Sequence, residues 1–164
     1  MFNKRPKVVL LVYGKGGHTA QMTRFINNQP KQWQVNEYVA LTNSDKLFSP
    51  FLAKYYIHEA RDRYSVFKNI FVFFTYLLLS NFQMTRIICK YQIVSMISTG
   101  PGMAVIPGLF CRLIGAKVIY FESWSRISTP AIAGKFMYRI AHIFFIQHKS
   151  LQKHYPKAMY MGRL

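Results

Sequence analysis

The sequence has few acidic residues and few cysteines. Its 164 residues include 5 Asp and Glu against 22 Lys and Arg, which gives a formal net charge of +17. Self-repulsion at this charge costs stability, so we expect an anionic partner: nucleic acid, anionic lipid or a phosphorylated substrate. Cys89 and Cys111 cannot build a disulfide scaffold, and their spacing, without a CxxC pair or a paired His, argues against a zinc site. These absences favour a reduced, cytosol-facing protein.

The sequence also shows no signal-peptide pattern and no composition typical of a disordered tail. The start, residues 1–7, is polar and basic, and the apolar run at 8–13 is too short for a signal peptide. Hydrophobic residues make up 51% of the chain and aromatic residues 16%, which excludes a disordered basic tail. There are no internal repeats and no low-complexity linker. The length therefore suits one domain, residues 1–164, with a real core.

The basic residues are interleaved with Phe, Tyr, Leu and Ile rather than with Gly, Ser and Gln. This mixture favours an anionic membrane surface over a ribosome-like role. The sequence carries no RRM, KH or helix-turn-helix signal, so a nucleic-acid-binding protein ranks last among the alternatives and we expect no nucleic-acid partner.

Strand and helix signals alternate along the chain. The patterns predict strands at 7–13, within 34–41, and at 55–58, 92–98, 117–121 and 142–147, and helices at 18–28, 66–89, 103–113, 130–141 and 149–154. Pro130 suits the first turn of its helix. This alternation predicts an α/β fold, a doubly wound Rossmann-like parallel sheet.

The predicted helix at 66–89 has an uncharged, apolar middle between Lys68 and Arg86. It is borderline short for spanning a bilayer, which takes about 20 such residues. We interpret it as a membrane-contacting helix that dips into one leaflet with its basic ends on the headgroups. The alternative is a core helix buried on two sides of the α/β domain. The residues expected to contact the membrane are Lys68, Phe71, Phe73, Phe74, Tyr76, Leu77, Phe82 and Arg86.

A glycine-rich loop lies between the first strand and the first helix. It consists of Gly14, Lys15, Gly16, Gly17, His18 and Thr19. Backbone N–H groups in such a turn can face an anion, although the spacing matches neither a P-loop nor GxGxxG, and a tight turn without a ligand is the alternative. His18 could serve as a general base or donate to a phosphate. Its alternative role is that of a capping or core histidine.

Two later segments also follow predicted strands. Thr99, Gly100, Pro101 and Gly102 repeat the glycine-rich arrangement, as a phosphate or sugar contact or as simple turn chemistry. Glu122 comes directly after the strand at 117–121, where it could pair with Arg126, bind hydroxyls or act as a catalytic base. His142, His148 and His154 show no metal-ligand spacing on one element, and no metal site is expected.

Three blocks in this order carry a resemblance that covers nearly the whole chain: VVLLVYGKGGHTAQM, ISTGPGMAVIPGLFCRLIGAKVIYFES and FFIQHKSLQKHYPKAMYMGRL. The sequence resembles the PssD/CpsF-type bacterial polysaccharide glycosyltransferase subunits. It also resembles the membrane-anchoring subunit of the eukaryotic two-part transferase that adds the second GlcNAc to dolichol-diphosphate-GlcNAc and, more distantly, the N-terminal half of MurG-like transferases.

The resemblance implies the acceptor-side half of a GT-B glycosyltransferase that is split between two polypeptides. A PssE-like subunit would bind the nucleotide sugar, and the segment 156–164 is a candidate for docking it. The pair would transfer a sugar, with inversion, from a UDP-sugar to an undecaprenyl-diphosphate-type lipid-linked saccharide in capsule or exopolysaccharide biosynthesis. The reaction would take place at the cytoplasmic face of the cell membrane, with peripheral or monotopic attachment. No metal or other cofactor is implied.

The resemblance also assigns residues. Gly14, Gly16, Gly17 and His18 match the family's GxGGH loop; Gly100, Pro101 and Gly102 match its GPG turn; Glu122 and Ser123 match its acidic position. Eukaryotic members often begin with a transmembrane helix, which this sequence lacks, so the helix at 66–89 is the expected substitute. His18 or Glu122 would deprotonate the acceptor hydroxyl, with His18 favoured. The alternative function is a non-catalytic membrane recruiter of a complete partner transferase.

Overall fold

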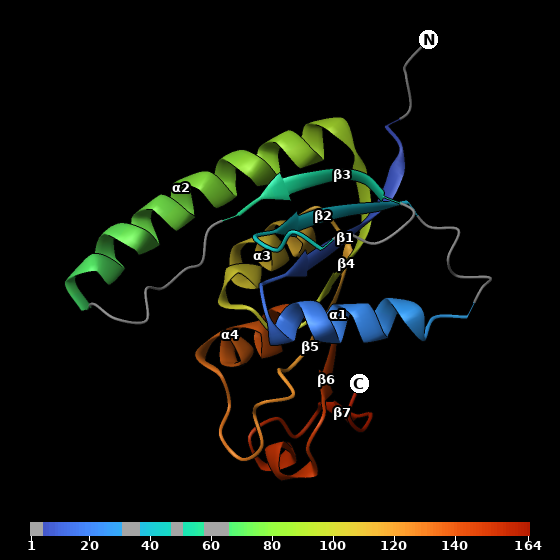
Figure 1. Ribbon diagram of the computed structural model, residues 1–164, viewed down its shortest axis with the longest axis vertical. Helices are drawn as coiled ribbons and strands as arrows, with labels where there is room; N and C mark the ends of the chain where they lie inside the picture. Colours follow the sequence, from blue (N-terminus) through green and yellow to red (C-terminus); the bar gives the residue numbers. More distant parts are fainter. Residues whose placement is uncertain (1–4, 31–36, 47–50, 58–65) are drawn as a thin grey trace.

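Seven parallel strands form one sheet in the computed structural model, which describes residues 5–30, 37–46, 51–57 and 66–164 (Figure 1). For Phe51 and residues 66–73 the backbone alone is described. The strand order is β3-β2-β1-β4-β5-β6-β7. The strands are β1 Lys7–Tyr13, β2 Tyr38–Thr42, β3 Phe51–Tyr56, β4 Gln92–Ser98, β5 Lys117–Phe121, β6 Ile143–Ile146 and β7 Met159–Tyr160.

Helices cover both faces of the sheet. The α-helices are α1 Gly17–Asn27, α2 Val66–Lys90, α3 Val105–Leu113 and α4 Ile132–Ile140, and two 3-10 helices are η2 Gly102–Ala104 and η3 Lys149–Lys153. Buried residues of α1 pack with one face of the sheet, and those of α2, α3 and α4 pack with the other. In Figure 1, α2, α3 and α4 follow one another across that second face, and α3 contacts both of its neighbours.

The alternating side chains of β1 explain why this strand is apolar throughout. Val8, Leu10 and Val12 belong to the core under α2, α3 and α4, whereas Leu11 and Tyr13 belong to the core under α1. A parallel strand that is covered on both faces has no solvent side, so it reads as a continuous hydrophobic run rather than an alternating one. The predicted doubly wound α/β fold is confirmed.

The strand order also shows where the direction of the chain reverses within the sheet. β1 lies between β2 and β4, so the chain runs outward in opposite directions from the β1–β4 pair. In open α/β sheets this reversal leaves a crevice beyond the carboxyl ends of the two central strands. The loop after β1 and the loop after β4 therefore begin side by side at this end of the sheet.

Several predicted boundaries differ from the observed ones. β3 covers Phe51–Tyr56 rather than 55–58, and residues 34–36 and 58 of the predicted strands lie outside the described residues. The predicted helix at 103–113 begins with the 3-10 turn η2. Pro130 lies before α4, whose N-cap is Ala131, so its placement in the first helical turn was wrong. β7 was not predicted, because two exposed residues carry no strand pattern.

The helix expected at 66–89 is α2, and its burial corrects part of the membrane-contact prediction. Tyr76 is 2% exposed, and its hydroxyl lies 3.3 Å from both the carbonyl oxygen of Met103 and the backbone N of Ile106. Leu77 is half-buried against the same core. Tyr76 therefore faces the protein and not a membrane, as the core-helix alternative expected.

The opposite side of α2 is exposed. Phe74 and Phe82 are 59% and 58% exposed, and Arg86 beside Phe82 is exposed as well. The side chains of Lys68, Phe71 and Phe73 lie outside the described part of the chain. Among the described residues, no helix combines the length and the hydropathy that crossing a bilayer requires.

Candidate functional site

Two glycine-rich loops meet at the carboxyl ends of β1 and β4. Nδ1 of His18 lies 2.6 Å from the carbonyl oxygen of Thr99, and the Thr99 hydroxyl donates a hydrogen bond of 2.8 Å to the carbonyl oxygen of His18. These reciprocal bonds join the predicted GxGGH loop to the predicted GPG loop. Two candidate anion-binding segments, 81 residues apart in the sequence, thus lie together at one end of the sheet.

The bond to Thr99 determines the tautomer of His18. A carbonyl oxygen can only accept a hydrogen bond, so Nδ1 of His18 must carry the proton. In the neutral imidazole the lone pair is then at Nε2, which is the atom that a general base requires. His18 is half-buried in the first turn of α1, at the carboxyl edge of the sheet, which is where open α/β folds generally bind their ligands.

The first loop is held by contacts that the sequence did not predict. The backbone N–H of Lys15 donates to Oδ1 of Asn43 at 3.0 Å, and the Thr19 hydroxyl lies 2.6 Å from the Gly14 carbonyl oxygen and 2.9 Å from the Ser44 hydroxyl. Asn43 and Ser44 follow β2, so the loop after the neighbouring strand supports the glycine turn. Asn and Ser are residue types common in turns, and only the pairing of β1 with β2 brings these two to the first loop.

The start of α1 carries no side-chain cap in the described part of the chain. Its N-cap is Gly16, with a φ of 68°, a backbone conformation that favours glycine. Its first turn contains no acidic residue. The first N–H groups of a helix have no partner within the helix and attract negative charge. Binding of an anion at the start of α1 stays a prediction of the glycine-rich pattern.

The second loop has little space for a side chain at Gly100. Gly100 has a φ of 95°, and a Cβ atom there would lie 3.0 Å from the backbone N of Ser123. A Cβ atom on Gly14 would lie 3.4 Å from Cβ of Pro101. Gly102 is exposed and has open space around it. The loops after β1, β4 and β5 therefore converge at one place.

Glu122 follows β5 as predicted, but its carboxylate is directed into the protein. The residue is 0% exposed, its Oε1 accepts from the backbone N–H of Ser123 at 3.0 Å, and its Oε2 accepts from the Tyr155 hydroxyl at 2.8 Å. Burial raises the pKa of this carboxyl above its ordinary value, although the two hydrogen bonds oppose the shift. Gly134 of α4 covers it: a Cβ atom there would lie 1.9 Å from Oε2.

The expected pairing of Glu122 with Arg126 does not form within ion-pair distance. Lys54 with Asp45, at 3.7 Å, is the ion pair found among the described residues. Glu122 binds a hydroxyl, that of Tyr155, which belongs to the protein itself. Ser123 is 8% exposed, and its hydroxyl oxygen lies 3.0 Å from the hydroxyl oxygen of Ser125.

Trp124 is a site residue that the sequence analysis missed. A Cβ atom on Gly17 would lie 3.1 Å from its Nε1, so the indole borders the first loop. The guanidinium groups of Arg24 and Arg163 lie 4.9 and 5.3 Å from the ring centroid. Trp124 follows Glu122 and Ser123 in the sequence, but only the packing of α1 and the last residues of the chain against it reveals its position.

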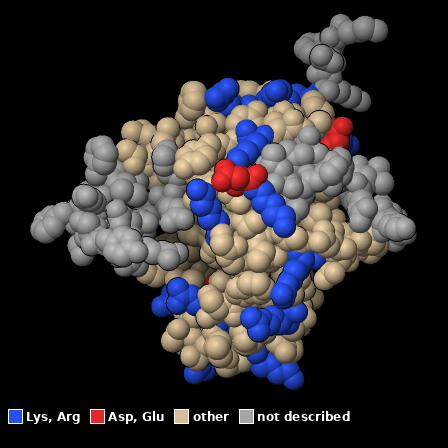
Figure 2. All heavy atoms as spheres, viewed as in Figure 1, with Lys and Arg blue, Asp and Glu red and all other residues tan. Residues whose placement is uncertain are grey.

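Basic residues greatly outnumber acidic ones on the described surface. Figure 2 shows several separate Lys and Arg groups on the face that Figure 1 presents, with acidic residues at few places. From residue 66 to 164 the sequence has 12 Lys and Arg and one acid, the buried Glu122. Within the described ranges, no group of three or more His, Cys, Asp and Glu residues is placed to hold a metal ion.

Comparison with a solved structure supports the fold. The crystal structure of MurG from Acinetobacter baumannii matches with a TM-score of 0.55 and 15% sequence identity, over 86% of this chain and 41% of that chain. The chain thus spans less than half the length of MurG. At this identity the likeness shows the fold alone. The shared fold agrees with the expected Rossmann-like half of a GT-B transferase.

Comparison with curated proteins covers nearly the whole sequence. The chain is 26% identical to the UDP-N-acetylglucosamine transferase subunit ALG14 of Rattus norvegicus and 27% identical to that of Homo sapiens, in each case over 95% of this chain and 82% of the relative. The Saccharomyces cerevisiae subunit is 25% identical over 99% of this chain and 78% of the relative.

A family profile matches almost the whole chain. The profile is that of the oligosaccharide biosynthesis protein Alg14 like, and it matches residues 9–164. The match includes both glycine-rich loops, His18 and Glu122. The chain therefore belongs to the Alg14-like family of oligosaccharide biosynthesis proteins.

Proposed function

We propose that this chain is the acceptor-side subunit of a two-component inverting glycosyltransferase. A separate nucleotide-sugar-binding subunit, of the PssE type or its eukaryotic counterpart, supplies the other half. The donor is a UDP-sugar, and UDP-GlcNAc is the first to test because the relatives are named UDP-N-acetylglucosamine transferase subunits. The acceptor is a saccharide linked to a lipid diphosphate, of the undecaprenyl type in capsule or exopolysaccharide synthesis or of the dolichyl type.

The observation that carries this proposal is the junction of the two glycine-rich loops. The mutual hydrogen bonds of His18 and Thr99 hold the uncapped start of α1 beside the Gly100–Gly102 turn. A diphosphate needs several N–H donors on one side, and a wall of two such loops offers them. The Lys and Arg excess of the chain supports the same choice of ligand, because a diphosphate is anionic.

His18 is the base in this mechanism. Nε2 of His18 removes the proton from the acceptor hydroxyl, the hydroxyl oxygen forms a bond to the anomeric carbon, and the bond from that carbon to the UDP oxygen breaks. Attack opposite to the leaving group inverts the configuration. UDP departs with the electron pair and is held by the partner subunit. Glu122 has no contact with solvent, so we assign it the role of holding the loop after β5 in place through Ser123 and Tyr155.

Membrane attachment is part of the proposal. The exposed Phe74 and Phe82 of α2, with Arg86 beside them, suit a helix that lies at the surface of a bilayer and buries its apolar side. We place this surface on the cytoplasmic side, as a peripheral or monotopic contact. The lipid-linked acceptor would then reach the crevice without leaving the membrane.

The test is sugar transfer with separately prepared components. UDP-GlcNAc and other UDP-sugars are offered with undecaprenyl-diphosphate-linked or dolichyl-diphosphate-linked GlcNAc to this chain alone, to the co-purifying partner alone, and to both together. The proposal predicts transfer with both components and none with either alone. Equal transfer by the partner alone on a water-soluble acceptor analogue would contradict it, and would make this chain a membrane recruiter.

A further inference from the structure

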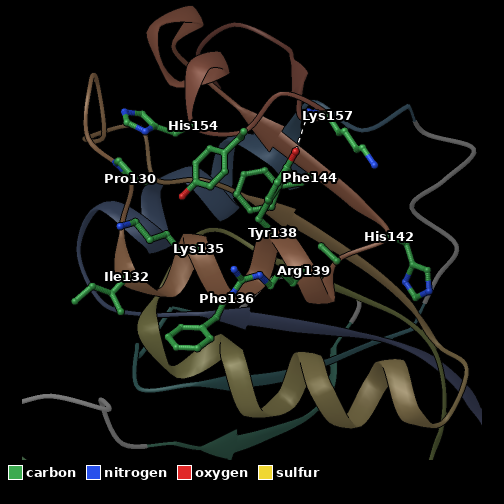
Figure 3. Close-up of a pocket in the computed structure, with 12 residues that line it drawn as sticks. Pro130, Ile132, Lys135, Phe136, Tyr138, Arg139, His142, Phe144, His154 and Lys157 are labelled. Carbon is green, nitrogen blue, oxygen red and sulfur yellow. Dashed lines mark hydrogen bonds between the residues drawn. The ribbon is translucent and has the colours of Figure 1, made fainter.

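A cavity beside α4 lies outside the site described above. It has a volume of about 750 Å³ and is lined by the outer side of α4, by the loops at both ends of that helix, and by the segment from His154 to Lys157 (Figure 3). Figure 3 shows the rings of Tyr138 and Phe144 in its middle, with charged side chains on either side. Neither the glycine-rich loops nor His18 contributes to its lining.

The charge of this cavity is positive. Lys135 and Arg139 come from α4 and Lys157 comes from the opposite wall, and all three are exposed. Among the described residues, no acidic side chain lines it. Glu122 lies behind the floor, where it accepts the hydrogen bond of Tyr155 and is 0% exposed. Three cations without a matching acid around one opening attract an anion.

The floor of the cavity is firmly packed. The rings of Tyr138, Phe144 and Tyr155 lie with their centroids 4.7 to 5.2 Å apart in all three pairs. The backbone N–H of Lys157 donates to the Tyr138 hydroxyl at 2.8 Å, which ties the two walls together. The opening is therefore formed by packed aromatic residues, and its cations project from a fixed frame.

The rim of the cavity is apolar and exposed. Ile132 and Phe136, one helical turn apart on α4, are 69% and 53% exposed. The neighbouring helices repeat this spacing: Leu109 and Leu113 on α3 are 43% and 76% exposed, and Leu78 and Phe82 on α2 are 72% and 58% exposed. α3 contacts both α2 and α4 on the same face of the sheet. Three adjacent helices thus each leave an apolar pair without cover among the described residues.

We propose that the cavity beside α4 binds the phosphate headgroup of an anionic phospholipid in the bilayer. Lys135, Arg139 and Lys157 contact the phosphate, and Ile132 and Phe136 enter the acyl region. The occupant is a lipid because the cationic opening continues directly into an exposed apolar face, which is the pattern of a surface that lies at the headgroup boundary. The inference rests on the proposed membrane association, but it does not depend on sugar transfer.

The test compares vesicle binding of the full chain and two double variants of equal charge. Lys135→Gln with Arg139→Gln removes two cations of the cavity. Lys7→Gln with Lys46→Gln removes two exposed cations that lie on none of the three helices. Binding is measured by co-flotation with phosphatidylcholine vesicles that contain 30 mol% phosphatidylglycerol, in 0.1 M salt, where charges more than about 10 Å from the surface are screened. Circular dichroism and melting temperature verify the fold of each variant.

Each cation near an anionic membrane strengthens binding roughly fivefold. Because the cavity variant loses two cations, it is expected to bind about 30-fold more weakly than the unmodified chain. The control variant is expected to lose less than about threefold. Equal losses in the two variants would overturn the inference and leave net charge as the cause. Absence of binding by the unmodified chain would contradict the proposed membrane association as well.

A second arm separates a lipid headgroup from a free phosphate compound. Millimolar glycerol 3-phosphate is added to the unmodified chain in the vesicle assay, and its own binding is followed by NMR shifts of the α4 residues. The inference predicts little displacement and no saturation, because the small anion lacks the acyl contacts. Saturation at the cavity with loss of vesicle binding would overturn the lipid assignment in favour of a soluble phosphate ligand.

Discussion

His18 connects two loops that the sequence leaves far apart. Its Nδ1 must donate to the Thr99 carbonyl oxygen, and this bond both joins the two loops and, in the neutral ring, leaves the lone pair at Nε2. One side chain thus combines a structural contact with the electronic form that a base requires. Mutation of His18 alone would remove both, so an experiment must separate them.

Replacement of His18 by Ala and by Asn makes this separation. We expect both variants to lower kcat of the reconstituted pair by about 10²- to 10⁴-fold, since general base catalysis contributes about that much. Asn can place its amide N–H where Nδ1 donates, so it keeps the link to Thr99 while it removes the base. Complex formation with the partner, measured by gel filtration, should be unchanged in both. Activity restored by Asn but not by Ala would show that His18 only positions the loops.

The buried carboxyl of Glu122 should make the free energy of unfolding depend on pH, and the direction of its pKa shift gives the sign. Its pKa is raised in the folded protein, chiefly by burial, above the ordinary value of 4.5. The folded state therefore holds the proton more tightly than the unfolded chain does. The stability that the neutral carboxyl contributes is present below about pH 4.5 and is lost as the pH rises through the raised pKa.

The free energy of unfolding of the natural chain and of Glu122→Gln, measured by urea denaturation from pH 4 to 8, isolates this contribution. We expect the natural chain to lose stability relative to the Gln variant as the pH rises, because Gln keeps an acceptor for Tyr155 or Ser123 without ionising. The opposite slope would mean that the ionised form is the stabilised one, for example through Arg126.

At the scale of elements, α2 has two different sides. The sequence predicted the extent of this helix within one residue. Its apolar residues occur on nearly every side of the helix, so they did not show which side is buried. The structure buries Tyr76, Met84 and Ile87 and exposes Phe74 and Phe82. Aromatic and aliphatic residues occur on both sides, so composition alone could not distinguish the core side from the outer side. The packing of α3 against α2 makes that distinction.

The outer side of α2 can be changed without loss of the fold. We expect Phe74→Ser with Phe82→Ser to change the free energy of unfolding by less than about 0.5 kcal/mol for each exposed site and to weaken vesicle binding markedly. Met84→Ala is the matched control: it lies at 0% exposure, so it should cost about 2–5 kcal/mol of stability and leave vesicle binding unchanged under conditions where it is folded. Unchanged flotation of the double Ser variant would remove α2 from the membrane contact.

At the scale of the whole molecule, the alternation of strands and helices was sufficient to predict the fold. Buried parallel strands such as β1 read as continuous apolar runs, and right-handed crossovers restrict how such units connect. The positions of the glycine loops at strand ends also followed from the pattern. Their junction did not, because it depends on the pairing of β1 with β4, which no local residue pattern specifies.

The same limit explains the residues that the sequence analysis missed. Asn43 reaches the first loop only through the pairing of β1 with β2, and Tyr155 reaches Glu122 across 33 residues. Trp124 meets Gly17 only once α1 is packed against the sheet. Each of these contacts joins distant segments, whereas the turn and strand signals that the sequence offers are local.

The central claim is that this chain binds the acceptor and its partner binds the donor. The measurement that tests it most directly is a titration of the full chain without partner, in detergent micelles, with lipid-diphosphate-linked GlcNAc and separately with UDP-GlcNAc, followed by NMR shifts of the Gly14–Thr19 and Thr99–Gly102 loops. The account predicts saturable shifts in both loops with the lipid-linked acceptor and none with UDP-GlcNAc at the same concentrations. Saturation by UDP-GlcNAc without a response to the acceptor would contradict it.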